Sequence, residues 1–106
     1  MESIKRLHAL EKRQAIGVLL FVRQHPSCTR KALYRELRSS TRIVASRIDE
    51  LVGIGLLKEE IETSGYRAHK ISLTDAGRKV ADHLVKIEMI VRDLGRYRNN
   101  FHHTES

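Results

Sequence analysis

Hydrophobic residues in the second quarter of the chain recur at helical spacing. Leu33 and Leu37 lie one turn apart, and they predict a short helix over residues 30–38 that buries this face. Thr29 stands directly before this helix, where its hydroxyl can accept a free backbone N–H group. The opposite face is polar and mostly basic, and we expect it to contact phosphate through Arg30, Lys31, Tyr34, Arg35 and Arg38.

A second apolar stripe predicts a helix over residues 41–54. Its members are spaced at i, i+4 and i+7, and they are Val44, Ile48 and Leu51. Gly55 follows at the point where the chain has to leave the helix, which favours a positive φ. Two short helices joined by a tight polar turn form a helix-turn-helix, whose second helix can enter a DNA major groove. Residues 29–55 therefore predict such a unit, with candidate base-reading residues Ser39, Ser40, Thr41, Arg42, Ala45 and Ser46.

The face of the second helix opposite the stripe carries groups that suit base edges. Arg42 near its start can reach guanine, and Ser46 can hydrogen-bond to several bases. Asp49 suits this role less well because its carboxylate repels phosphate, although it can accept from a cytosine amino group or orient an arginine. The alternative is that these residues form an ordinary solvated helix face.

After the second helix the hydrophobic period changes to two, as in half-exposed strands. Leu57 and Ile61 alternate with charged residues, a Thr-Ser-Gly turn follows at 63–65, and a second alternating run ends at Leu73. Residues 56–73 therefore predict a two-stranded hairpin, the wing, whose first strand is acidic and whose second strand is basic. If the wing contacts DNA, we expect the residues near its tip to do so, namely Ser64, Tyr66 and Arg67.

The N-terminal part predicts one long helix over residues 3–24, with a break near Glu11. Residues 15–22, AIGVLLFV, are apolar on nearly all sides, so we expect this segment to be buried on more than one side. Such surplus apolar surface in a small domain favours a second subunit, and the alternative is a well-buried central helix of a monomer. His25-Pro26 ends the helix because proline disfavours helix in the residue before it.

Residues 75–97 predict a final helix, capped by Thr74. Its apolar residues follow a 4-3-4-3 spacing typical of a coiled-coil seam, and they are Val80, Leu84, Ile87, Val91 and Leu94. The remaining core is too small to cover so long a stripe, so we expect both the N-terminal helix and a second copy of the chain to cover it, in a twofold dimer. An intramolecular helical hairpin is the alternative. The polar residues 99–106 predict a mobile tail.

The 106 residues suit one small domain, which we place at 1–98. The net charge of +7 favours a polyanionic partner. Residues 1–40 carry nine Lys or Arg and three Asp or Glu, whereas residues 41–62 carry three and five. Residues 63–106 carry eight and five. Positive charge therefore flanks the predicted reading helix, as phosphate contacts around a groove require.

Composition also excludes several classes of protein. No apolar run approaches the ~18 residues of a membrane span. Cys28 is the only cysteine, so no internal disulfide can form, and we expect a cytoplasmic protein; a redox role for this thiol stays open. We find no zinc motif, phosphate-binding loop or nucleophile paired with a base, and therefore expect no cofactor, no metal and no enzyme.

Two short motifs add a family resemblance. Leu51 to Leu57 matches a Leu-x-x-x-Gly-Leu-Leu motif, and Leu73 to Gly77 matches a Leu-Thr-x-x-Gly motif that opens the last helix. Both motifs are present at the separation expected for one family. The segment from about Arg13 to Leu94 resembles winged helix-turn-helix transcription regulators of the MarR type and their small archaeal and bacterial relatives. The fold this implies is α+β, mostly α, with a helical core, a hairpin wing and a long C-terminal dimerisation helix.

The resemblance implies a homodimer that places two recognition helices in successive major grooves of a pseudo-palindromic site. It also implies that the stretch 39–46 reads bases and that Arg67 is the basic wing residue. The chain departs from the family in being shorter, in its acidic first wing strand, and in lacking the clustered Cys and His ligands of metal-sensing relatives. A small-molecule effector, the operator and the sign of regulation stay open.

We therefore expect a sequence-specific regulator that binds double-stranded DNA as a homodimer. One alternative is an architectural protein that coats or bridges DNA without sequence preference. A second alternative is a winged-helix module that binds another protein, which the acidic wing strand and Asp49 would suit.

Overall fold

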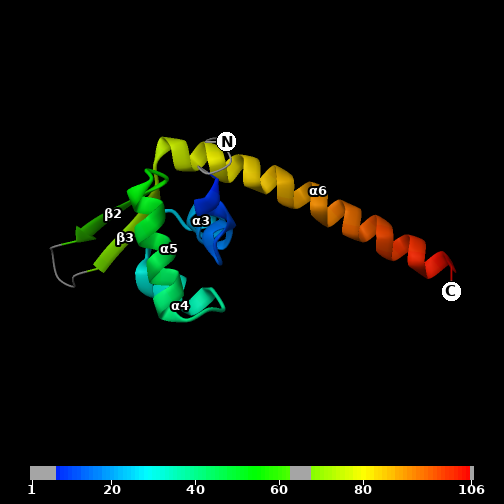
Figure 1. Ribbon diagram of the computed structural model, residues 1–106, viewed down its shortest axis with the longest axis horizontal. Coiled ribbons are helices and arrows are strands. Elements are labelled where there is room, and N and C mark those ends of the chain that lie inside the picture. Colours follow the sequence, from blue (N-terminus) through cyan, green and yellow to red (C-terminus); the bar gives the residue numbers. More distant parts are fainter. Residues whose placement is uncertain (1–6, 63–67, 106) are drawn as a thin grey trace.

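The computed structural model describes residues 7–62 and 68–105, with side chains up to residue 95. Figure 1 shows a compact helical body that carries a hairpin on one side, while the last helix projects away from the other side. The elements in chain order are α2 (His8–Glu11), α3 (Ala15–Gln24), β1 (Cys28–Thr29), α4 (Arg30–Glu36), α5 (Thr41–Gly53), β2 (Leu57–Glu62), β3 (Ala68–Leu73) and α6 (Asp75–Glu105).

A small antiparallel sheet with strand order β1-β3-β2 lies beside the helices. β2 and β3 pair from Leu57↔Leu73 to Glu62↔Ala68, which confirms the predicted hairpin. β1 adds a third strand through Cys28↔Ile71. The tip residues selected from the sequence lie outside the described residues, and they are Ser64, Tyr66 and Arg67.

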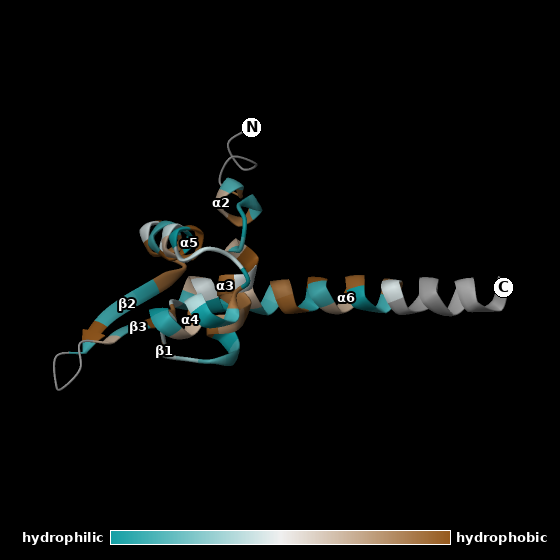
Figure 2. Ribbon diagram, turned by 90° about the horizontal axis from the view of Figure 1, so that it is seen from below, coloured by the Kyte–Doolittle hydropathy of each residue, from teal (hydrophilic) through white to brown (hydrophobic). Residues whose placement is uncertain are grey.

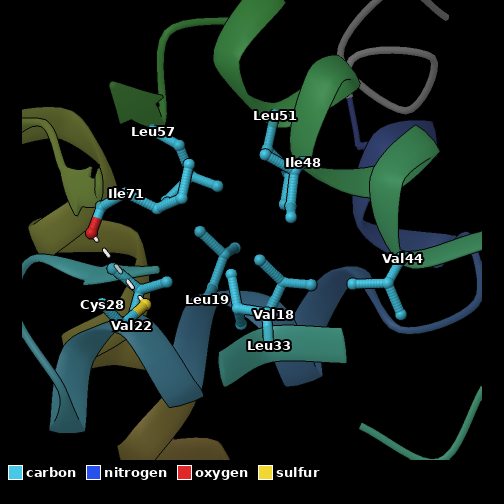
Figure 3. Packing of buried hydrophobic residues seen from close by; sticks show 10 residues of the cluster. All are labelled: Val18, Leu19, Val22, Cys28, Leu33, Val44, Ile48, Leu51, Leu57 and Ile71. Carbon is cyan, nitrogen blue, oxygen red and sulfur yellow. Dashed lines mark hydrogen bonds between the residues drawn. The ribbon is translucent and has the colours of Figure 1, made fainter. Parts of the chain in front are cut away.

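One hydrophobic core joins α3, α4, α5 and the sheet. Figure 3 shows side chains from the helices and strands pointing into the same interior. The three stripe residues of α5, Val44, Ile48 and Leu51, are at most 1% exposed, as the spacing predicted. The rest of the cluster consists of Val18, Leu19, Val22, Cys28, Leu33, Leu57 and Ile71. Burial of this stripe turns the opposite face of α5 toward solvent.

The N-terminal segment contains two helices and a sharp bend. α2 ends at Glu11, where the break was predicted, and Gln14 adopts a left-handed φ of 69° immediately before α3. The Gln14 amide donates to the Ser39 hydroxyl at 2.9 Å, which ties the bend to the turn between α4 and α5. The bend lets α3 enter the core while α2 lies to one side.

The helix-turn-helix forms with the expected caps. The Thr29 hydroxyl accepts from the Ala32 amide at 3.1 Å, and the Ser40 hydroxyl accepts from the Ile43 amide at 3.2 Å. α4 is shorter than predicted, because it ends at Glu36 and places Leu37 and Arg38 in the turn. Leu37 is half-buried and packs against the core from the turn, not as part of the helix.

The end of α5 and the start of α6 meet at a tight joint. Gly55 has a φ of +89°, as predicted for the helix exit. The Thr74 hydroxyl donates to the Gly55 carbonyl at 2.5 Å and accepts from the Gly77 amide at 3.0 Å. A β-carbon at position 77 would lie 1.9 Å from the Leu56 carbonyl oxygen, so only glycine allows this approach. The two sequence motifs therefore form one structural unit.

α6 extends through Glu105, past the helix end predicted at residue 97 and into the segment predicted as a polar tail. The early turns of α6 pack on α3, where Ala81 is fully buried. Farther along, its apolar residues are exposed, and Figure 2 shows hydrophobic segments of α6 beyond the body of the protein. The alternative of a full-length intramolecular hairpin is excluded for the described residues, since α3 covers only the first part of α6.

We predict that Gly77→Ala destabilises the protein by about 3 kcal/mol, because backbone atoms cannot move aside as a flexible side chain can. Urea denaturation followed by circular dichroism measures this change. Gly53→Ala is the matched control, because nothing lies within 4 Å of a β-carbon at that helical position. That control should change stability by less than about 1 kcal/mol. Equal effects of the two substitutions would contradict the steric explanation.

Candidate nucleic-acid interface

The exposed face of α5 presents the predicted base-reading residues unequally. Thr41, Arg42 and Ser46 are exposed, and Ala45 is half-buried. The hydroxyls of Ser39 and Ser40 already accept hydrogen bonds within the protein, from Gln14 and from the backbone of α5. Because each hydroxyl keeps a donor proton, capping does not prevent an outward contact. Arg42 and Ser46, one turn apart, are the pair most available to a ligand.

Free cations lie beside this face on α4 and in the following turn. Lys31, Arg35 and Arg38 are exposed, and none of them pairs with a carboxylate among the described side chains. The same holds for Arg42 on α5. Tyr34 differs, because it is half-buried against the core. Unpaired cations around a protruding helix are what contact with a phosphate backbone requires.

Arg30 belongs to a cluster of polar and charged side chains that the spacing in the sequence did not predict. Its Nε donates to Glu59 Oε2 at 2.5 Å and its Nη2 to Glu59 Oε1 at 3.0 Å. Nη2 also donates to Asp49 Oδ1 at 2.5 Å, and Nη1 lies 3.4 Å from the Tyr34 hydroxyl. His69 Nδ1 lies 3.1 Å from Glu59 Oε2. These contacts join α4, α5, β2 and β3, and we call Arg30, Asp49, Glu59 and His69 the Arg30 cluster.

The side chains of the Arg30 cluster differ in their exposure to solvent. The Arg30 and Glu59 side chains are only 19% and 20% exposed, whereas the Asp49 side chain is 67% exposed. The hydrogen bond from Arg30 holds the pKa of Glu59 below its ordinary value, and the hydrogen bond to Glu59 raises the pKa of Arg30. Both groups therefore stay charged throughout the physiological range. The guanidinium predicted to contact phosphate is thus held by two carboxylates of the protein.

A second ion-pair group anchors the other side of α5. Glu50 accepts from Lys12 at 2.5 Å and from Arg47 at 2.6 Å, so α5 is tied to the bend before α3. The hydrogen bond from Lys12 lowers the pKa of Glu50. Since Arg47 is engaged here, Arg42 is the one arginine of α5 without an ion pair among the described side chains.

The wing carries cross-strand charge pairs of the kind its composition predicted. Lys70 and Glu62 approach to 3.7 Å, and His69 pairs with Glu59. Pairs that are this exposed contribute little to stability. The acidic strand β2 packs beside α5, and basic residues of β3 partly neutralise the charge of β2.

The predicted interface residues of α6 divide into two groups. Val80 and Leu84 are half-buried against the body. Ile87, Val91 and Leu94 are 55%, 62% and 57% exposed. A groove of about 310 Å³ runs between α3 and α6, and its walls are Ile16, Leu20, Leu84, Ile87, Glu88, Val91 and Arg92. The exposed part of the stripe is therefore continuous with an apolar groove.

The described residues contain no group of three or more His, Cys, Asp or Glu arranged to hold a metal ion. None of their helices is both long and apolar enough to span a membrane.

No family model matches the sequence, and no curated protein is significantly similar to it. Solved structures do match. The transcriptional regulator homologue from Pyrococcus horikoshii OT3 superposes with a TM-score of 0.70 at 19% identity, over 89% of this chain and 98% of that one. The adhesin competence repressor AdcR of Streptococcus pyogenes gives 0.73 at 17% identity, over 91% and 75%.

A third solved structure, a possible HxlR family transcriptional factor from Thermoplasma volcanium GSS1, matches with a TM-score of 0.68 at 24% identity. It covers 85% of this chain and 81% of its own. The fold is a winged helix-turn-helix. The α+β prediction is therefore confirmed, and the three neighbours are described as a transcriptional regulator homologue, a competence repressor and a possible transcriptional factor.

We predict that Glu59→Gln lowers the free energy of unfolding by about 1–2 kcal/mol at pH 7, because Arg30 loses a charged acceptor. The folded-state pKa of Glu59 is lowered, so this stability is present above about pH 4.3 and is lost as pH falls through the lowered pKa. Urea denaturation at pH 7 and at about pH 3 should show the wild-type and variant curves converging at acid pH.

Glu60→Gln serves as the control for Glu59→Gln. Glu60 is exposed on the same strand and makes no ion pair with a described side chain, so its loss should change stability by less than about 0.5 kcal/mol. A stability difference for Glu59→Gln that persists unchanged at acid pH would contradict the ion-pair explanation.

Proposed function

We propose that the protein is a sequence-specific transcriptional regulator, similar to the MarR type, that binds double-stranded DNA as a homodimer. The observation that carries this proposal is the exposed face of α5. Its apolar stripe is buried, and Arg42 and Ser46 are exposed on the opposite side. Arg42 forms no ion pair with a described side chain. Such side chains suit base edges in the major groove.

Phosphate contacts would come from the cations that surround α5. Lys31 and Arg35 lie one turn apart on α4, Arg38 follows in the turn, and all three are exposed. Contacts of this kind supply most of the affinity and fix the register of the protein on the duplex, while base contacts supply the selectivity. Because α5 itself carries a low net charge, its contribution to DNA affinity would depend on base contacts.

Dimerisation would proceed through α6. The described part of one chain leaves Ile87, Val91 and Leu94 more than half exposed along one stripe. Exposed large apolar residues that form a continuous stripe mark an interaction surface. The 4-3-4-3 spacing suits a like helix, so a second copy of α6 is the partner we propose. Two copies related by a twofold axis would present two recognition helices to one duplex.

The architectural alternative keeps the same cations and needs no base selectivity. The recognition face favours the regulator over this alternative, because Asp49 repels phosphate and contributes nothing to sequence-independent binding. The protein-binding alternative draws on the acidic residues of β2. The free cations of α4 favour DNA over that alternative, since they have no acidic counterpart among the described side chains.

We predict that selection from random DNA followed by sequencing yields an inverted repeat, and that the protein protects it in a footprint at about 0.15 M salt. Arg42→Ala should lower affinity for that repeat by about 1–3 kcal/mol and relax the preference at one position in each half-site. Arg35→Ala should weaken binding to all sequences alike and reduce the salt slope by about 1.

Uniform binding with a steep salt dependence would support the architectural alternative and overturn regulation. Full DNA affinity in a variant that carries both Arg42→Ala and Arg35→Ala would overturn the assignment of this surface.

We predict that the wild-type chain of 12.2 kDa sediments at twice its own mass, and that Ile87→Glu with Val91→Glu converts it to a monomer. Four carboxylates, two from each copy, would be buried between the paired helices, at a large desolvation penalty. Met89→Glu is the control, since Met89 is also exposed but lies off the stripe. Dimers that persist in the Ile87/Val91 variant, or monomers in the wild type, would contradict the proposed interface.

A further inference from the structure

Arg30 occupies a place where a DNA-binding protein would gain affinity from a free cation. It is the first residue of α4, adjacent to the exposed Lys31, and it reaches the recognition helix at Asp49. Asp49 lies on the same exposed stripe of α5 as Arg42 and Ser46, at i+7 and i+3 from them. The Arg30 cluster therefore lies between the recognition helix and the wing, at the edge of the proposed interface.

The carboxylates of the cluster outnumber its permanent cation. Asp49 and Glu59 each accept from Arg30, and three of the guanidinium hydrogen bonds go to these two side chains. Arg30, Asp49 and Glu59 together carry one net negative charge. The Arg30 side chain is only 19% exposed, and its guanidinium also donates to the Tyr34 hydroxyl. Four of its five N–H groups are therefore occupied within the protein.

We propose that Asp49 and Glu59 withhold Arg30 from the phosphate backbone and thereby raise the sequence selectivity of the protein. This inference rests on the proposed function. Phosphate contacts strengthen binding to every sequence equally, so an arginine withheld from them lowers non-specific affinity. Discrimination then depends more heavily on the base contacts of Arg42 and Ser46, because specificity is a difference between two affinities.

A purely structural role for the cluster makes different predictions. Ion pairs that only hold α4, α5 and the wing together would leave the protein less stable and its DNA binding weaker when they are removed. Release of a withheld arginine instead strengthens non-specific binding, even though stability falls. The salt dependence of binding, and whether its change requires Arg30, therefore separates the two roles.

The test compares Asp49→Asn/Glu59→Gln with wild type on a random-sequence duplex and on the selected repeat, over a range of salt. One additional phosphate contact steepens the salt dependence by about 0.9 in log–log slope, which is about tenfold in non-specific affinity at about 0.1 M salt. We expect this gain together with a reduced specificity ratio. An unchanged or shallower slope would overturn the proposal.

Two further variants make the assignment specific to Arg30. Glu36→Gln/Glu60→Gln removes the same charge from two exposed carboxylates that form no ion pair with a described side chain, so any gain should be smaller and the slope unchanged. Adding Arg30→Gln to the Asp49/Glu59 variant should return the slope to the wild-type value. A gain that survives Arg30→Gln would show that loss of negative charge alone is responsible and would overturn the withholding role.

Circular dichroism of each variant establishes that it folds. If the double variant does not fold, Arg30→Gln alone keeps the test decisive. A withheld arginine makes no phosphate contact, so its loss should leave the salt slope unchanged, whereas a slope shallower by about 0.9 would overturn the proposal. Wild-type binding without sequence preference would overturn the proposed function while the slopes still test the withholding of Arg30, and no DNA binding by any variant would overturn both.

Discussion

The absence of a side chain at Gly77 allows α6 to start directly against the end of α5. The Leu56 carbonyl occupies the space that a β-carbon would need, and Thr74 bonds to both sides of the contact. In the proposed dimer, each recognition helix is carried by its own α6. The distance between the two helices then depends on this joint, and half-sites on B-DNA tolerate little variation around one helical turn.

The charges near α5 divide into those that are free and those that are held. Lys31, Arg35 and Arg38 have no carboxylate partner among the described side chains, whereas Arg30 and Arg47 are bound by acidic residues. A count of the basic residues near α5 therefore overstates how many cations the proposed interface presents. Three acidic residues in and beside α5 look unfavourable for DNA binding in the sequence, and they are those that pair with the held arginines: Asp49, Glu50 and Glu59.

Much of the fold could be predicted because its causes are local in the chain. The stripe of Val44, Ile48 and Leu51, the caps at Thr29 and Thr74, and the alternation of the wing each depend on residues within one or two turns of each other. The base-reading and phosphate residues were predicted in the same way, from the face that remained after burial, and they stay a proposal. The Arg30 cluster could not be predicted, because its partners lie 19 and 29 positions away.

The sequence by itself determined which faces are apolar, where the helices begin, and where a glycine is needed, since these follow from spacing and backbone sterics. Only the tertiary structure decided which of the basic side chains are available. That choice depends on the packing of α4, α5 and β2, which brings Glu59 and Asp49 to the same guanidinium. It also decided that α3 covers only the first part of α6, because the bend at Gln14 directs α3 into the core and leaves the outer stripe exposed.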